Sequence, residues 1–175
     1  QDNQVRASRN HGILLRNLYY SRITGNRTTQ NKDGFFFSGC SYDTLDGNFV
    51  SANETGIHVS DSADNLVTGN AFVDNDEQLN YQDNSILVWD SEQGGNYWSD
   101  YVGWDRNGDG LGDRPHHPTD ISSYLVQRFP AIRLVLHSPA MALLRGLESR
   151  FPVIRPPGVR EPRPLMANPI TPPAR

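Results

Sequence analysis

The chain has 175 residues, a formal net charge of −4 and 36% hydrophobic residues, which suits one domain with an appendage. A single lysine, and 18 Asp and Glu against 8 Lys and Arg over residues 1–120, argue against nucleic acid as a partner, and the one cysteine, Cys40, excludes an internal disulfide. Residues 121–175 instead carry 8 arginines against 2 glutamates, and all 12 prolines lie at Pro115 or later, so the composition predicts two structural regimes that meet near residues 115–120.

A repeat of 22 residues organises the first part of the chain. Apolar positions recur at this interval, as in Ile13, Phe35 and Ile57, and so do glycines and asparagines. The repeated polar positions, which we interpret as structural turn columns, are Gly12, Gly34, Gly56, Asn26, Asn48, Asn70, Asn31, Asn53 and Asn75. A fixed period of this length is typical of a solenoid.

Short alternating runs such as "GILLRN" and "DTLDGN" indicate strands between tight turns. We therefore predict an all-β fold, a right-handed single-stranded parallel β-helix with coils of 22 residues, followed by a short α-helical, proline-rich C-terminal tail. Stacked asparagines are expected to hydrogen-bond along the axis, and glycines to supply positive φ at corners. The predicted parts are coils over 1–96, a capping loop over 97–120 and a docking tail over 121–175, and we expect further coils before Gln1.

A fourth, irregular coil follows the three regular ones. Ile86 and Val88 take its strand positions, and Gly95-Asn96 takes the Gly-Asn position, 26 residues after Asn70. The next segment is rich in aromatic residues, namely Tyr97, Trp98, Tyr101 and Trp104. Such side chains are large enough to cover the open end of a solenoid core, and the alternative is an exposed stacking platform for sugar rings.

The loop after these aromatics has the spacing of a calcium site. Oxygen-bearing side chains alternate, a glycine stands at position six, and an aspartate stands at position nine. The candidate calcium ligands are Asp105, Asn107, Asp109, Asp113 and the carbonyl of Leu111. His116 stands where an EF-hand has glutamate, so we expect a structural calcium loop or, alternatively, a loop of Asx turns without an ion.

Histidine and methionine side chains are the candidate copper ligands, because copper favours imidazole and thioether donors. Two adjacent histidines follow the loop, and two methionines lie further along. The candidates, chosen on this chemistry alone, are His116, His117, Met141 and Met166.

Helical patterns begin at Asp120. Asp120 is expected to cap a first helix, and Ser138 a second one that opens with Pro139. The second helix is amphipathic, and its candidate partner-docking residues are Met141, Leu143, Leu144, Leu147 and Phe151. The tail either packs back on the solenoid as a cap or docks a partner, and its last stretch, 155–175, is expected to be extended and either disordered or docked.

Four stretches together resemble the C-terminal half of the NosD-type accessory proteins of nitrous-oxide reductase maturation. They are "GNYWSDYVGWDRNGDGLGDRP", "YLVQRFPAIRLVLHSPAMALLR", "FPVIRPPGV" and "PLM". The resemblance implies a periplasmic, non-catalytic protein that works with an ABC transporter, comprising an ATPase and a permease, and associates with the membrane through it. It also implies transient copper binding, with nitrous-oxide reductase as the client.

The rival interpretation is a carbohydrate-active enzyme, since parallel β-helices also host polysaccharide lyases, epimerases and hydrolases. Such a site needs an acid, a base and a charge-neutralising group on one face. Asp43, Asp61 and Asp64 lie near one turn column, but no cationic residue accompanies them there. We therefore expect a protein that is not an enzyme.

Overall fold

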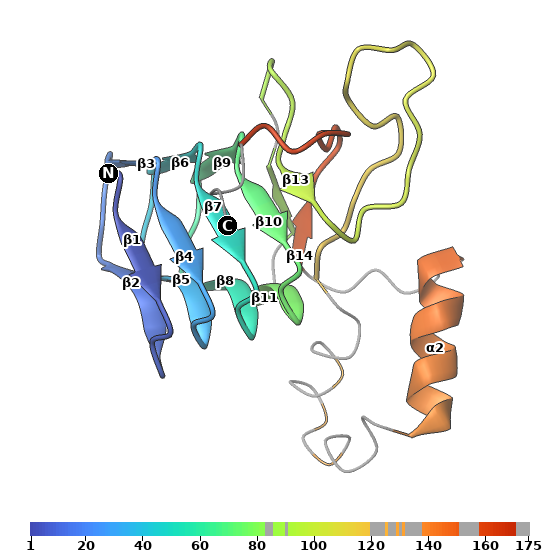
Figure 1. Cartoon of the computed structure of the whole chain (residues 1–175), viewed down its shortest axis with the longest axis horizontal. Helices are drawn as coiled ribbons and strands as arrows, with labels where there is room; N and C mark the ends of the chain where they lie inside the picture. Colours follow the sequence, from blue (N-terminus) through green and yellow to red (C-terminus); the bar gives the residue numbers. More distant parts are fainter. Residues whose placement is uncertain are drawn as a thin grey trace.

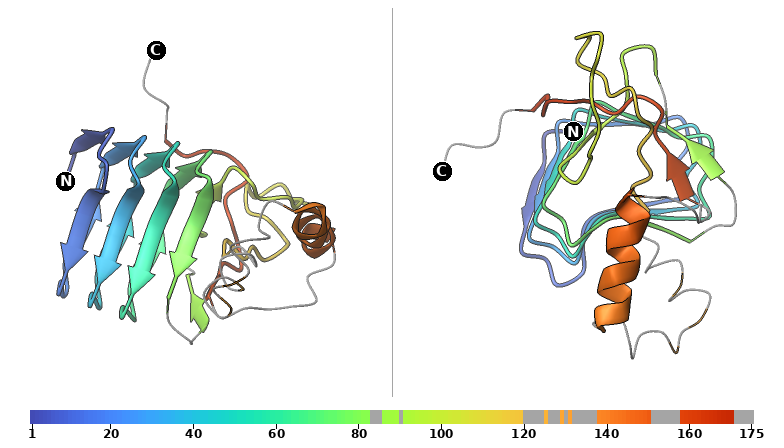
Figure 2. Two further views of the ribbon diagram at one scale, coloured as in Figure 1. Left: turned by 90° about the horizontal axis from the view of Figure 1, so that it is seen from below. Right: turned by 90° about the vertical axis from the view of Figure 1, so that its right-hand side faces the viewer.

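Parallel strands stack into a solenoid of about four coils in the computed structural model, which describes residues 1–82, 86–89, 91–119, 125, 129, 131, 138–150 and 158–170. The coils follow one another along the long axis of the molecule (Figure 1) and superimpose when seen end-on (Figure 2, right). The predicted parallel β-helix is confirmed. Within the described ranges, no helix is both long enough and apolar enough to cross a lipid bilayer.

Three stacked sheets form the walls of the solenoid. The first contains β1 (Gln4–Arg6), β4 (Arg27–Thr29), β7 (Phe49–Ser51), β10 (Ala71–Val73) and β13 (Tyr97–Trp98). The second contains β2 (His11–Arg16), β5 (Asp33–Ser38), β8 (Thr55–Ser60) and β11 (Glu77–Tyr81). The third contains β3 (Arg22–Thr24), β6 (Thr44–Asp46) and β9 (Leu66–Thr68).

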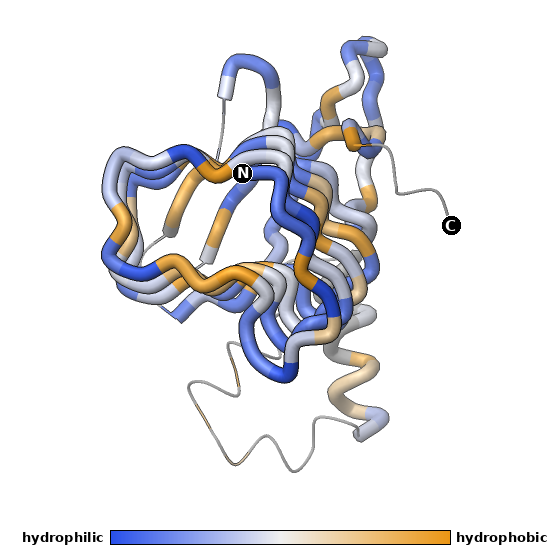
Figure 3. The backbone as a smooth tube through the Cα atoms, turned by 60° about the vertical axis from the view of Figure 1, so that its left-hand side comes forward, coloured by the Kyte–Doolittle hydropathy of each residue, from blue (hydrophilic) through white to orange (hydrophobic). Residues whose placement is uncertain are grey.

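The register of the sheets follows the 22-residue repeat. Ile13 pairs with Phe35, Phe35 with Ile57 and Ile57 with Leu79. Successive side chains of a strand point to opposite faces of the sheet. The column that contains Phe35 and the column that contains Phe37 and Val59 therefore both point into the core. Figure 3 shows the hydrophobic segments of successive coils above one another.

Two asparagine ladders run along the axis inside the turns. In the first, the backbone N–H and the side-chain amide of Asn26 both donate to Oδ1 of Asn48, each at 2.9 Å. Asn48 donates to Asn70 in the same way, and Asn70 to Asn96. The second ladder joins Asn31, Asn53 and Asn75. In each of these pairs the backbone N–H and one side-chain N–H donate to the next coil, which gives the ladders a direction, while Asn48 and Asn70 also donate to carbonyl oxygens of the preceding coil.

The glycine columns have two different structural roles. Gly25, Gly47 and Gly69 have φ between 64° and 70°, as expected for turn corners. The expectation of positive φ was wrong for the column Gly12, Gly34 and Gly56, none of which is in that region. A Cβ on Gly34 would lie 2.5 Å from the carbonyl oxygen of Gly56 and 2.7 Å from Val50, so close approach of the next coil requires glycine there.

Two further described elements lie at the C-terminal end of the stack. Strand β12 (Ile86–Val88) pairs in parallel with β14 (Gly158–Arg160). Helix α2 (Pro139–Arg150) lies beyond the last coil (Figure 1), and the hydroxyl of Ser138 accepts a hydrogen bond from Met141 N at 3.3 Å, as the predicted cap requires. The first helix predicted, after Asp120, falls mostly outside the described residues.

Candidate functional site

The end of the solenoid is closed by a strap from the far end of the sequence, residues 158–166. Its first strand is β14, and Leu165 then bridges both Tyr97 and Leu111. Met166 N donates to the carbonyl oxygen of Gly110 at 3.0 Å. This part of the proline-rich stretch is docked on the solenoid of its own chain.

Glu161 in the strap terminates the first asparagine ladder. Its carboxylate accepts hydrogen bonds from the backbone N–H and side-chain amide of Asn96 and from Trp98 Nε1. The side chain is 0% exposed. An ionised carboxylate has acceptors and no donors, so it satisfies the last amide of the ladder and ends it. A Cβ on Gly95 would overlap this carboxylate, and glycine is required there for that reason.

The aromatic residues of this end differ in burial. Trp98 is 1% exposed and stacks on Phe72, with ring centroids 4.3 Å apart and an interplanar angle of 11°. Trp89, which was not among the aromatic residues expected at this end, also stacks with Trp98, with ring centroids 6.4 Å apart. Trp104 is 49% exposed beneath the guanidinium of Arg106. Trp98 therefore belongs to the core, and Trp104 does not.

His116 lies on the covered side of the cap. Its ring is 5.5 Å from Trp98 and 5.4 Å from Tyr101, and its backbone exchanges hydrogen bonds with Glu161. Its Nε2 lies 3.6 Å from Oδ1 of Asp100 and has no hydrogen-bond partner, although it is buried. His116 is thus positioned by the strap and presents one imidazole nitrogen without a hydrogen bond.

The other copper and docking candidates come from separate segments. His117 is exposed beside His116, and Met166 is 37% exposed in the strap. On α2, Met141 is 7% exposed, whereas Leu143 is 64% exposed. The side chains of Leu144 and Leu147, and the whole of Phe151, lie outside the described residues.

The loop 105–113 uses its oxygen-bearing side chains to hold its own backbone. Asp105 accepts from the N–H groups of Gly108 at 2.7 Å and Gly110 at 2.9 Å. Asp109 accepts from Leu111 N at 2.8 Å, and this bond, together with one from the Asn107 amide, lowers the pKa of Asp109. Asp113 accepts from Arg106 N at 2.8 Å. These are Asx-turn contacts, and carboxylate lone pairs remain for a cation.

A cluster of two histidines and an aspartate lies on the outer face of the second sheet, and the sequence analysis missed it. His11 Nδ1 is 2.8 Å from one carboxylate oxygen of Asp33, and His58 Nδ1 is 3.8 Å from the other. Phe36 packs between the two imidazoles, with its ring centroid 4.4 Å from that of His11 and 4.5 Å from that of His58. The repeat could have indicated this cluster, because His11 and Asp33 are 22 residues apart in one column and His58 is in the column of Phe36.

The electrostatics of this cluster favour an ionised Asp33. Burial raises the pKa of its carboxyl, but hydrogen bonds from His58 and His11 and their charges outweigh burial, so the pKa lies below its ordinary value. His58 Nε2 is buried without a hydrogen-bond partner. Across the part of the chain that the structure describes, no three His, Cys, Asp or Glu side chains are arranged as a metal site, and this cluster is no exception.

Comparison with known proteins points to one family. Residues 1–103 match the family model described as periplasmic copper-binding protein (NosD). The chain is 38% identical over 179 residues to a Pseudomonas aeruginosa protein named probable ABC transporter binding protein NosD, covering 94% of this chain. It is 37% identical over 183 residues to a Stutzerimonas stutzeri protein of the same name, covering 95% of this chain. The chain spans 42% of the length of each of these relatives.

Proposed function

Because the chain belongs to the NosD family of periplasmic copper-binding proteins, we propose that it forms part of an accessory protein that works with an ABC transporter to deliver copper to nitrous-oxide reductase. The observation that carries the proposal is the family match over residues 1–103, which covers the coils. The printed names of both relatives support an ABC transporter, with its permease and ATPase, as the partner. The copper client rests on the resemblance of the loop and tail motifs described above.

Copper is the cargo in this proposal, and its transient ligands would be histidine and methionine side chains. Among the candidates, His116 fits best, because its Nε2 is buried and makes no hydrogen bond. A neutral imidazole with one free nitrogen is ready to bind a metal ion. His117 follows His116 directly, and Met166 lies in the strap, which the bridge between His116 and Glu161 joins to the same end of the solenoid. Met141, on α2, remains a candidate by chemistry.

A structural calcium ion in the loop 105–113 is a further part of the proposal. Asp105, Asn107, Asp109 and Asp113, with the carbonyl of Leu111, would supply oxygen ligands of the type that calcium prefers. The loop would then hold the turn between the last coil and the tail.

Transporter docking is assigned to α2 and is tested by substitution there. Leu143 is 64% exposed and Ala142 beside it is exposed as well, so a charge at either position leaves the core unchanged. We expect Leu143→Asp to reduce co-purification with the permease and ATPase from detergent extracts, with an unchanged melting temperature. Ala142→Asp is the matched control and should retain the transporter. Equal recovery with both variants would remove α2 from the docking surface.

The carbohydrate-enzyme alternative now has one observation in its favour, the cluster of His11, Asp33 and His58. Acid–base chemistry uses such groups. The aspartates named from sequence do not join it: Asp43 is 1% exposed and accepts a hydrogen bond from Ser21 N at 2.7 Å, a structural contact. Incubation with polygalacturonate and alginate oligomers decides, and we expect no shortened or unsaturated products. Product formation that is lost in Asp33→Asn would establish the enzyme.

A further inference from the structure

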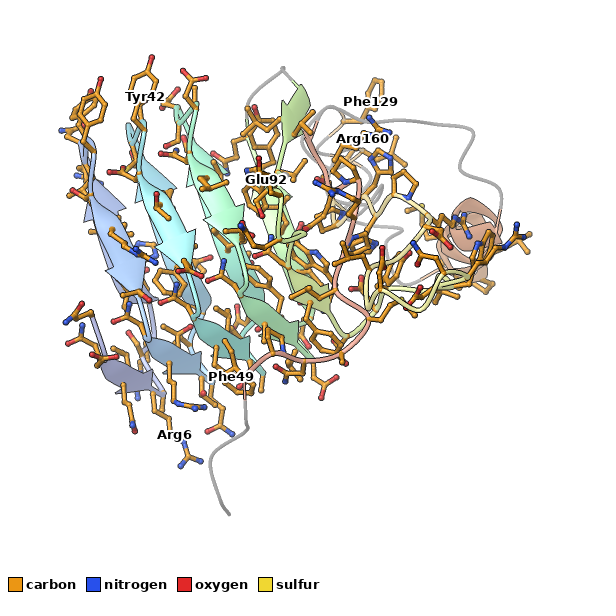
Figure 4. All side chains as sticks on the ribbon, turned by 90° about the horizontal axis from the view of Figure 1, so that it is seen from above. Arg6, Tyr42, Phe49, Glu92, Phe129 and Arg160 are labelled. Atoms are coloured by element: carbon orange, nitrogen blue, oxygen red, sulfur yellow. The ribbon has the colours of Figure 1, made fainter. Side chains whose placement is uncertain are left out.

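A row of tyrosines lies on the outer edge of the solenoid, where three turns stack between the second and third sheets. The turns span 17–21, 39–43 and 61–65. The tyrosine edge consists of Tyr19, Tyr20 and Tyr42, which are 59%, 80% and 52% exposed. The rings of Tyr20 and Tyr42 stack in parallel, with centroids 5.2 Å apart and an interplanar angle of 8°. Figure 4 shows Tyr42 pointing away from the coils.

The backbone of these turns makes tyrosine an unexpected choice. Each turn has two positions with positive φ. At the first stand Asn17, Gly39 and Asp61, whose residue types adopt this conformation readily. At the second stand Tyr20 with φ 53° and Tyr42 with φ 60°, followed in the next coil by Asp64 with φ 55°. Asp64 shows that the same turn forms with a residue suited to it, so the fold does not demand tyrosine.

The side chain of Tyr42 is exposed although a coil lies on each side of it. Tyr20 stacks on one side, and Asp64 is its neighbour on the other. A large aromatic residue that is half exposed between two coils, in a strained backbone conformation, adds little to the core. Side chains that oppose local backbone preference in this way are characteristic of functional surfaces, and tyrosine is enriched where proteins bind one another.

The charge of the surface identifies the kind of partner. The three turns contain no Lys or Arg. Arg16 and Arg22 flank the first turn, and Arg22 is paired with Asp46 at 2.6 Å, whereas Asp61 and Asp64 are exposed in the third turn. Ser41 pairs in parallel with Ala63, which places Tyr42 and Asp64 at equivalent positions of adjacent coils, and the negative charge of Asp64 raises the pKa of the Tyr42 hydroxyl. Aromatic rings next to carboxylates favour a cation, which is attracted by both the ring face and the negative charge, whereas a neutral sugar gains hydrogen bonds to the carboxylates but no charge attraction.

We propose that the tyrosine edge docks a protein segment that presents an arginine side chain. The guanidinium would stack on a tyrosine ring while its N–H groups donate to Asp64, a combination that lysine cannot reproduce. The chain uses the same stacking internally, where Arg27 lies 5.2 Å from the centre of the Phe49 ring and Arg106 lies 5.5 Å from that of Trp104. The proposal concerns a different face from α2 and does not depend on the copper proposal.

Photo-crosslinking in cells tests the partner directly. Replacing Tyr42 by p-benzoylphenylalanine in the full-length protein keeps an aromatic ring at the surface. After irradiation, mass spectrometry should find the p-benzoylphenylalanine at position 42 joined to a partner peptide that contains arginine, and changing that arginine to glutamine should abolish the crosslink. The control places p-benzoylphenylalanine at position 104, since Trp104 is exposed but lies next to the loop 105–113 and away from the tyrosine edge. This variant should not yield the same peptide. Crosslinks without arginine in the peptide, or no protein crosslink, would overturn the proposal.

A second measurement keeps folding and binding apart. The variant Tyr42→Asn places a residue that prefers positive φ in the turn, so its melting temperature should equal or exceed that of the unmodified protein. Nuclear magnetic resonance titration with an arginine-containing peptide should shift signals of the tyrosine edge, less so at high salt, and Tyr42→Asn should lose the response. Equal shifts with a citrulline-substituted peptide, or shifts with cello-oligosaccharides instead, would contradict an arginine site.

Discussion

Glu161 shows at the residue scale how one side chain decides where a repeat ends. Each asparagine of the first ladder donates two hydrogen bonds toward the C-terminal end, so the last asparagine needs an acceptor group that has no donor of its own. The Glu161 carboxylate provides it, and also receives Trp98 Nε1 at 2.6 Å. A buried charge is tolerated here because three donors surround it.

We expect Glu161→Ala to lower the melting temperature strongly. The substitution leaves buried donors of Asn96 and Trp98 without partners, at about 1–3 kcal/mol each. The melting temperature of Glu161→Gln should fall between those of Glu161→Ala and the unmodified protein, because the glutamine amide places an additional donor among groups that are already donors. Thermal denaturation followed by circular dichroism measures both. If Glu161→Ala melts like the unmodified protein, the strap does not end the ladder.

Asp33 gives a pH dependence of known sign. Its pKa is lower in the folded chain than in the unfolded one, so its contribution to stability is complete above the unfolded value, about 3.9, and is lost as the pH falls through the lower, folded pKa. Asp33→Asn should therefore destabilise at pH 6 and lose that effect progressively below about pH 4. Melting temperatures measured from pH 3 to 7 test this, with the exposed Asp76→Asn as control. A constant difference at every pH would refute the assignment.

At the scale of the element, the strap explains why the tail could not be predicted. Its strand, β14, is only three residues long and sits among prolines, and it pairs with β12, whose residues lie 72 positions earlier in the sequence, so no local pattern marks it. The 22-residue repeat, by contrast, appears in the sequence because every coil repeats the same contacts. The two kinds of glycine column share one spacing, and only the positions of neighbouring atoms separate positive φ from close approach.

The loop 105–113 carries a prediction of its own. If its free carboxylate lone pairs bind calcium, adding the ion should raise the melting temperature and EGTA should reverse the gain. Asp109→Asn should weaken the response, and Asp100→Asn, outside the loop, should keep it. A melting temperature that ignores both calcium and EGTA would leave the Asx turns as the whole explanation of the loop.

At the scale of the whole molecule, the sequence was sufficient to predict the coil architecture and insufficient to predict the side-chain clusters on the outer face. The repeat predicted the parallel β-helix, because periodic burial leaves a periodic sequence. The outer-face cluster at Asp33 and the tyrosine edge were missed, although His11 and Asp33 are 22 residues apart, as are Tyr20 and Tyr42, because the repeat shows which residues share a column and not which outward side chains contact one another. The result is a rigid solenoid, closed by its own strap, with polar and aromatic groups displayed outside.

The central claim, copper delivery to nitrous-oxide reductase, is tested by the copper content of the reductase purified from cells that lack the full-length protein. The account predicts a reductase without its copper in those cells and full copper content when the protein is restored. Restoration with His116, His117, Met141 and Met166 all replaced by alanine should leave the reductase depleted. A reductase that is fully loaded with copper in the complete absence of the protein would contradict the account.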